Sequence, residues 1–391
     1  MWRRWSRRLA LVAVSIGAAL VAAELAVARW FPVGSSLYEL DEVLLFRPIP
    51  GARSVLVMSA REGRRYVPLA LDAEGFRGPG KSARRPRIAL YGDSFVMAEN
   101  VRFADTFGER LEVHLAELLG RSVEVVQAGA SGYGPDQAFL RMQREIETLA
   151  PDLVLFVLCA ANDFGDLVRN KMFRLAEDGE LVANDYTIDP SVVSEFAARE
   201  RAARRPALVR LFEAWRRPSP ARRTTAYVEL YLRAAAGHYE QFALRGENNV
   251  YTLFQDFYDA DLAIYPDWPS SAFKRDLMGA LLERIAEFAR GRGVPLFAVV
   301  VPPAVDLDET FDIRVDTRLY PSYDAERLGR TLAELLDAAE IPFLDLYSAF
   351  RDAGPRGLFE GGDDAHWNVR GQDFGAQRAA RALADWGGLA D

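Results

Sequence analysis

Short, continuous apolar runs alternate with amphipathic segments along much of the chain. Runs typical of buried strands occupy residues 87–91, 123–126, 153–158, 295–301 and 341–346. Apolar residues recur at helical spacing over residues 106–119, 135–149, 272–290, 323–339 and 371–386. Strands that alternate with helices of this length predict a parallel sheet with helices on both faces, which is an α/β fold.

The first thirty residues have a different pattern, because residues 9–28 are apolar around the whole helix circumference. Twenty helical residues rise about 30 Å, which is enough to cross the hydrocarbon core of a bilayer. Arg3, Arg4, Arg7 and Arg8 precede this stretch, whereas only Arg29 follows it. The asymmetry predicts an anchor over residues 1–30, with a cytoplasmic N-terminus and an exported, periplasmic body held at the inner membrane. The alternative is a signal peptide cleaved after Ala26-Val27-Ala28.

The remainder of the chain divides at two places. Residues 31–84 are proline-interrupted, with a short alternating run at 54–58, and we expect an accessory segment there. Residues 85–391 form the main domain, and residues 165–270 interrupt its strand–helix rhythm with a mostly helical insertion. An insertion after the third strand usually lies at the carboxyl edge of the sheet, so we expect it to cap the site.

Two stretches of this insertion stand out by composition. Residues 199–223 are arginine-rich and helical in pattern, and residues 251–268 are aromatic-rich. The aromatic residues fit either a platform for sugar rings or the core of the cap.

Composition excludes some classes of function. Five arginines and one glutamate give residues 1–30 a net charge of +4, which leaves −12 for the rest of the chain. A body with this much negative charge lacks the basic surface that binds nucleic acid. Cys159 is the single cysteine, and only three histidines occur, His114, His238 and His366. We therefore expect neither a histidine-rich metal site nor a resident cofactor.

Three candidate chemical groups follow the first three strands. Gly92-Asp93-Ser94-Phe95 comes directly after the first, and a sharp strand-to-helix turn there would present the Ser94 hydroxyl. Gly132, after the second, lets the backbone approach a bound acyl group. Asn162, after the third, can supply an amide donor. Each alone is also typical of an ordinary turn or helix cap.

A fourth group lies before the last helix, where His366 follows Asp363-Asp364-Ala365. A histidine that acts as a base needs its second ring nitrogen held, and an acidic residue three positions earlier can do this. A surface-loop histidine is the plainer interpretation. A metal site is disfavoured, because no further histidine accompanies it.

In this order, the four groups resemble the Ser, Gly, Asn and His blocks of the SGNH/GDSL hydrolase family. The resemblance covers roughly residues 85–165 and 290–388, and it implies a flavodoxin-like three-layer α/β/α sandwich. It also implies that Ser94 is the nucleophile and His366 the base. Asp363 would orient His366, although the Asp-x-His spacing of some related acetyltransferases would select Asp364 instead. The oxyanion hole would comprise the N–H groups of Ser94 and Gly132 and the side chain of Asn162.

Two positions depart from the family pattern. Ala160 stands where the third block commonly has a glycine, and Gln127 stands where an asparagine often precedes the glycines of the second block. The anchor, residues 71–78 and His366-Trp367-Asn368 are similar to membrane-anchored SGNH-like proteins of bacterial envelopes. We therefore expect an ester hydrolase acting on an acylated small molecule, lipid or polysaccharide. An O-acyltransferase with the same residues and an inert, membrane-tethered glycan-binding or assembly subunit are the alternatives.

Overall fold

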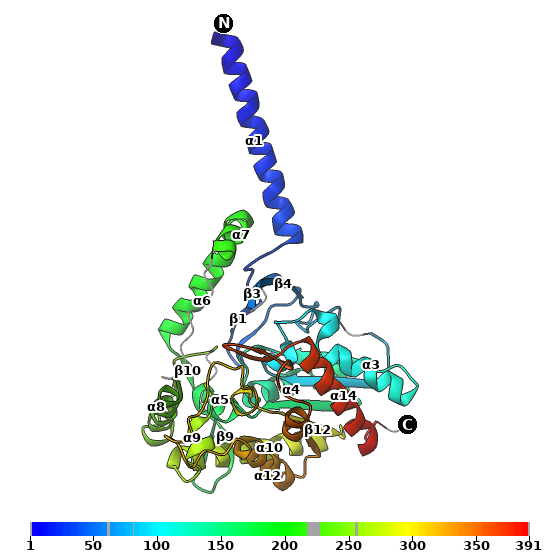
Figure 1. Ribbon diagram of the computed structural model, residues 1–391, viewed down its shortest axis with the longest axis vertical. Helices are drawn as coiled ribbons and strands as arrows, with labels where there is room; N and C mark the ends of the chain where they lie inside the picture. The colour runs from blue at the N-terminus through cyan, green and yellow to red at the C-terminus, as the bar shows by residue number, and fades with distance from the viewer. Residues whose placement is uncertain (1, 61–62, 81, 217–226, 255–256, 390–391) are drawn as a thin grey trace.

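A computed structural model describes residues 2–60, 63–80, 82–216, 227–254 and 257–389 of the protein. The first helix, α1 (Trp2–Trp30), projects from one end of the body (Figure 1). Over residues 5–30 this helix is long and apolar enough to cross a membrane. The predicted anchor therefore is a candidate membrane span, by length and composition.

Five parallel strands form the central sheet of the body, in the order β13-β12-β7-β5-β6. Their bounds are β5 (Arg87–Gly92), β6 (Glu124–Gly129), β7 (Leu153–Cys159), β12 (Leu296–Val301) and β13 (Phe343–Asp345). Numbered along the chain, this is the order 2-1-3-4-5 of flavodoxin-like folds. Ile88 in β5 is paired with Val125 in β6 and with Leu153 in β7, so β5 lies inside the sheet. The predicted α/β fold with a flavodoxin-like sheet is confirmed.

Helices cover both faces of this sheet. Side chains that alternate along the strands face two separate apolar cores, because successive residues of a strand point to opposite sides. One core includes residues of α4 (Pro135–Leu149), α5 (Asp163–Asn170), α10 (Pro269–Gly291) and α12 (Arg327–Ala338). The other includes residues of α3 (Phe107–Leu119), α13 (Tyr347–Asp352) and α14 (Val369–Trp386). The three layers are therefore helices, sheet and helices.

Smaller elements surround the sandwich. The N-terminal segment forms the hairpins β1 (Tyr38–Asp41) with β2 (Leu45–Pro48) and β3 (Arg53–Ala60) with β4 (Gly63–Ala70). The insertion is mostly helical, with α6 (Pro190–Ala203), α7 (Ala207–Arg216), α8 (Tyr227–Tyr239), a π-helical turn (Glu240–Leu244) and α9 (Ala260–Ile264). It also holds the short strands β8 (Phe173–Leu175), β9 (Leu181–Ala183), β10 (Thr187–Ile188) and β11 (Asn249–Val250). Near the sheet edge lie α2 (Ser94–Met97), a 3-10 turn (Phe103–Asp105), α11 (Ala304–Leu307), β14 (Phe359–Gly361) and β15 (Asp364–Trp367).

Two predicted helical stretches differ from the structure by more than three residues at a boundary. The arginine-rich stretch 199–223 is split between α6 and α7, because Pro206 cannot continue a helix; residues 217–223 lie outside the described residues. The helix expected from residue 323 begins at Arg327, since Asp324 accepts the N–H of Glu326 at 3.0 Å and forms a turn before it.

A buried ion cluster joins the insertion to the sandwich. Nζ of Lys274 in α10 lies 2.7 Å from Oδ1 of Asp259 and 2.7 Å from Oδ1 of Asp261, and all three side chains are at most 4% exposed. The other carboxylate oxygen of Asp259 accepts the N–H of Gly165 in α5 at 3.1 Å. Burial lowers the pKa of Lys274, but the two carboxylates outweigh it and raise that pKa overall. The lysine is therefore charged and necessary to balance the carboxylates.

Replacing Lys274 with methionine is expected to destabilise the protein by about 3–5 kcal/mol, because it leaves two buried carboxylates without their cation. Denaturant unfolding of the full chain in detergent measures this loss. The matched control is Arg290→Ala on the same helix, where an exposed pair with Glu340 should contribute less than about 1 kcal/mol. Equal losses in the two variants would contradict the prediction.

Candidate active site

Ser94 lies where the interior strand β5 ends and the short helix α2 begins. Asp93 is the N-cap of α2, and its Oδ1 accepts the N–H of Phe95 at 2.8 Å. The chain turns here against β7, and a Cβ added at Gly92 would lie only 3.0 Å from the carbonyl oxygen of Val157. Glycine therefore allows the tight turn that brings Ser94 to the carboxyl edge of the sheet.

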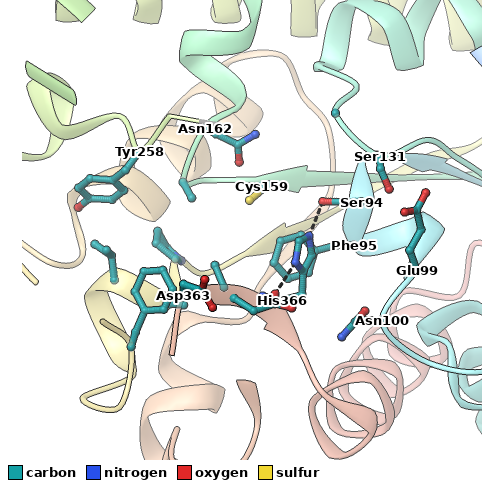
Figure 2. Close-up of a pocket in the computed structure, with 18 of the residues that line it drawn as sticks. Ser94, Phe95, Glu99, Asn100, Ser131, Cys159, Asn162, Tyr258, Asp363 and His366 are labelled. Carbon is teal, nitrogen blue, oxygen red and sulfur yellow. Dashed lines mark hydrogen bonds and ion pairs between the residues drawn. The ribbon is translucent and has the colours of Figure 1, made fainter. Parts of the chain in front are cut away.

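His366 reaches this serine from the far end of the chain, on β15. Its Nε2 lies 2.7 Å from Oγ of Ser94, and its Nδ1 lies 2.7 Å from Oδ1 of Asp364 (Figure 2). Asn368 then begins α14, where its Oδ1 accepts the N–H groups of Arg370 and Gly371 at 2.9 and 3.1 Å. The helix cap fixes one end of β15 and with it the position of His366.

The carboxylate at His366 is Asp364, so the prediction that Asp363 orients the histidine is wrong. Asp364 and His366 are two residues apart on β15, and alternate residues of a strand point to the same side. Asp363 precedes the strand, is exposed and lines the adjoining cavity. In a turn, an aspartate three residues before His366 could reach the ring. In a strand, the aspartate two residues before His366 lies on the same side as the ring.

The environment of Asp364 favours its ionised form. Burial raises its pKa, but the charge of His366 and hydrogen bonds from the ring and backbone N–H of His366 outweigh this, with a smaller contribution from Arg65. The net effect lowers the pKa of Asp364. An ionised Asp364 holds the proton of His366 on Nδ1 and leaves Nε2 free to accept the proton of Ser94.

The two expected oxyanion donors beyond Ser94 lie along the same edge. Gly132 has a φ of +81°, which a residue with a side chain rarely adopts, and an added Cβ would lie 3.2 Å from the carbonyl oxygen of Leu253. Asn162 donates one amide hydrogen to Oδ2 of Asp166 at 2.7 Å, and Asp166 is paired in turn with Arg169. An amide nitrogen carries two hydrogens, so this bond orients the side chain and leaves one donor for a ligand.

One cavity of about 630 Å³ joins these groups, because Ser94, Gly132, Asn162 and His366 all line it. Polar side chains, among them Glu99, Asn100 and Ser131, lie on the Ser94 side, and Tyr258 lies on the opposite side (Figure 2). The cavity wall also includes apolar residues of three other regions, namely Leu56, Val57 and Met58 of β3, Tyr231 and Phe254 of the insertion, and Val305, Phe311 and Ile313 after β12.

The aromatic residues of 251–268, for which a sugar platform and the core of the cap were the two interpretations, are divided between different surroundings. Phe254 and Tyr258 line the cavity, whereas the rings of Tyr265 and Trp268 stack on each other with centroids 4.2 Å apart. Residues 255 and 256 of that stretch lie outside the described residues.

The N-terminal segment contributes to the site in a way that the sequence did not reveal. Oη of Tyr38 in β1 accepts the N–H of Ser131 at 3.0 Å and donates to Oε1 of Glu99 at 2.6 Å. Both partners line the cavity beside Ser94. Tyr38 therefore fixes the loop that holds Gly132. Tyr38 and Ser131 are 93 residues apart in the sequence, so no local sequence pattern indicates this contact.

A buried carboxyl group with two tyrosine partners lies behind the apolar side of the cavity. Oδ1 of Asp306 accepts hydrogen bonds from Tyr258 at 2.7 Å and from Tyr323 at 2.6 Å. Burial raises the pKa of Asp306 from 3.8 to about 7, although the hydrogen bonds from both tyrosines lower it. The native state therefore retains this proton at pH values where the unfolded chain releases it.

This difference predicts a pH-dependent stability. The contribution of Asp306 is fully present below about pH 4 and is lost as the pH rises to about 7, because ionisation then opposes burial. Asp306→Asn cannot ionise, so its stability relative to the wild type should increase over this interval. Urea unfolding at several pH values measures the change, with the exposed Asp337→Asn on α12 as the control. A constant difference across the interval would contradict the assignment.

A hydroxyl, an imidazole and a carboxylate joined by two hydrogen bonds have the geometry of a Ser-His-Asp triad of the serine hydrolase type. The sheet order and the placement of the serine, glycine, asparagine and histidine blocks at one sheet edge agree with the SGNH/GDSL resemblance of the sequence.

No protein-family model matches the chain, and no curated protein matches it. Several solved structures are similar to it in fold. The esterase EstA from Pseudoalteromonas sp. has 10% identity and a TM-score of 0.38, with 77% of this chain and 98% of that chain covered. The acetyl xylan esterase AlAXEase has 12% identity and a TM-score of 0.37, with coverages of 77% and 98%. The lipase/acylhydrolase from Enterococcus faecalis has 12% identity and a TM-score of 0.33, with coverages of 77% and 96%.

Proposed function

We propose that the protein is a serine ester hydrolase that works through an acyl-Ser94 intermediate. The observation that carries this proposal is the pair of 2.7 Å hydrogen bonds from Ser94 to His366 and from His366 to Asp364. They join residues 272 positions apart in the sequence at the rim of one cavity. A fold that needed these residues only for packing would not require the hydroxyl and both ring nitrogens to be aligned.

In the proposed reaction, Nε2 of His366 accepts the Ser94 proton while Oγ attacks the ester carbonyl carbon. The N–H groups of Ser94 and Gly132 and the amide of Asn162 stabilise the oxyanion. His366 then donates its proton to the departing alcohol, and the carbon–oxygen bond to that alcohol breaks. A water molecule, deprotonated by His366, releases the acid from Ser94. Asp364 stabilises the imidazolium at both stages.

The chemistry of the cavity suggests the substrate class. An apolar side suits an acyl chain, and the polar side near Glu99 and Asn100 suits an alcohol with several hydroxyl groups. We therefore propose an acylated envelope glycan or lipid as substrate, with α1 anchoring the body on the exported face of the inner membrane. The same polar side has room for an acceptor alcohol, which favours O-acyl transfer to a polysaccharide as the second candidate.

Covalent labelling with a fluorophosphonate tests the proposal directly, because such probes react with an activated serine. The full chain in detergent is treated with the probe, digested and analysed by mass spectrometry. The adduct is expected on Ser94 in the folded protein and should be absent after denaturation. Failure to label Ser94 would favour an inert binding or assembly subunit. A panel of short and long acyl esters, with and without an oligosaccharide acceptor, then separates hydrolysis from transfer.

A further inference from the structure

The helix α7 presents three partly exposed apolar side chains along one side. Val209, Phe212 and Trp215 are 37%, 52% and 64% exposed, and their three-residue spacing places them along one side of the helix. The rings of Phe212 and Trp215 are neighbours, with centroids 6.2 Å apart. We call these three side chains the α7 apolar face.

The helix is attached to the candidate membrane span by a charged cap. The carboxylate of Glu24 in α1 accepts the first backbone N–H groups of α7, those of Ala207 and Leu208, the latter at 3.0 Å. An anionic side chain at a helix N-terminus satisfies unpaired N–H groups and interacts favourably with the helix dipole. A second bond joins Nη1 of Arg210 to Oγ of Ser35 just beyond α1, at 2.9 Å. Figure 1 shows α7 beside the end of α1 that enters the body.

Helix geometry gives the depth at which this attachment occurs. Residues 9–28 rise about 30 Å, the thickness of the hydrocarbon core, and Glu24 lies about one helical turn before the distal end of this stretch. Trp5 and Trp30 are 62% and 76% exposed, as expected for the aromatic residues that flank a span. With residues 9–28 in the hydrocarbon, Glu24 lies about 6 Å of helix before the distal boundary, so α7 begins close to the bilayer surface.

The arginine residues near α7 are compatible with the headgroup region of a bilayer. Arg204 and Arg205 are exposed directly before the helix, where they pair with Glu200 and Glu213, and the guanidinium of Arg216 lies over the ring of Phe212, 5.5 Å from its centroid. Arginine pairs well with phosphate groups, and aromatic side chains prefer the boundary between headgroups and acyl chains.

We propose that the α7 apolar face docks on the surface of the bilayer that α1 spans, so that the body has two membrane contacts. The proposal rests on α1 remaining attached as a span, and it is independent of the reaction at Ser94. A second contact fixes the rotation of the body, which a single helix would leave free. The isolated bridge between Val33 and Val55 joins the end of α1 to β3, a wall of the cavity, so docking also fixes how the cavity faces the membrane.

Site-specific photocrosslinking tests this contact. The photoreactive residue p-benzoylphenylalanine replaces Phe212 in the full chain, reconstituted into vesicles of phosphatidylethanolamine and phosphatidylglycerol. Val14 within α1 is the positive control, and Leu319, 71% exposed on the body, is the matched negative control. Position 212 should give at least about tenfold more lipid adduct than position 319, as expected for a side chain buried at the interface.

Three results would overturn the proposal. Lipid adducts at position 14 but not at position 212 would show that α7 lies away from the bilayer. Adducts between position 212 and a second copy of the chain would assign the face to self-association. No lipid adduct at position 14 would remove the span, and the docking proposal with it. Fluorophosphonate labelling of Ser94 in the same vesicles shows whether the protein remains folded, so a failure here is distinct from a failure of the proposed activity.

Discussion

Replacing Ser94 with alanine is expected to lower kcat/KM for p-nitrophenyl acetate by roughly 10⁴- to 10⁶-fold, because it removes the hydroxyl that lies 2.7 Å from Nε2 of His366. A residual rate above that of water is expected from the oxyanion donors. The loss should appear in kcat, since the substitution removes the attacking atom and leaves the cavity wall in place.

Ser131→Ala is the matched control for this variant. Ser131 lines the same cavity, and the substitution retains its backbone N–H, which donates to Tyr38 at 3.0 Å, so the loop should keep its position. Its activity is expected to stay within about threefold of the wild type, as for a surface substitution that removes no catalytic group. Thermal unfolding of both variants verifies that the fold is retained. Full activity of Ser94→Ala would refute the triad.

The substitution Asp364→Asn has the second largest expected effect. An amide in place of the carboxylate cannot stabilise the imidazolium, and it favours the tautomer whose Nε2 carries the proton and cannot act as a base. We expect kcat to fall by about 10⁴-fold with little change in structure. The variant is assayed with the same ester over a range of pH, because a hydroxide-assisted pathway would restore part of the rate at high pH.

The neighbouring aspartate is the control for position and charge. Asp363→Asn removes the same charge one residue away but outside the strand that carries His366, and its activity should remain within a few-fold of the wild type. The opposite result, a large loss at Asp363 and a small one at Asp364, would show that the loop rearranges before catalysis.

The sheet and the position of Ser94 at its carboxyl edge were accessible from the sequence for one physical reason, whereas the meeting of Ser94 with His366 was implied by the family resemblance. Buried parallel strands are continuous apolar runs, and the carboxyl ends of parallel strands meet at one edge of the sheet. A polar group that follows such a run therefore has a known place. The glycine of the second block and the asparagine of the third follow the same rule, and both line the cavity with Ser94.

The carboxylate partner of His366 could not be derived in this way. Its identity depends on whether residues 364–367 form a strand or a turn, and so short a segment has no apolar alternation that distinguishes the two. The pairing with β14, which creates the strand, is a tertiary feature. Likewise, the contacts of Tyr38 with Ser131 and of Glu24 with α7 join segments far apart in sequence, and no local pattern indicates them.

The bond between Tyr38 and Ser131 has a practical consequence for producing the protein without its membrane helix. A shortened version that starts at the first strand of the sheet would lack Tyr38 and β3, so the second-block loop would lose its support and one side of the cavity would be open to water. A secreted form intended for enzymology or crystallisation should therefore begin soon after Trp30, with both N-terminal hairpins retained.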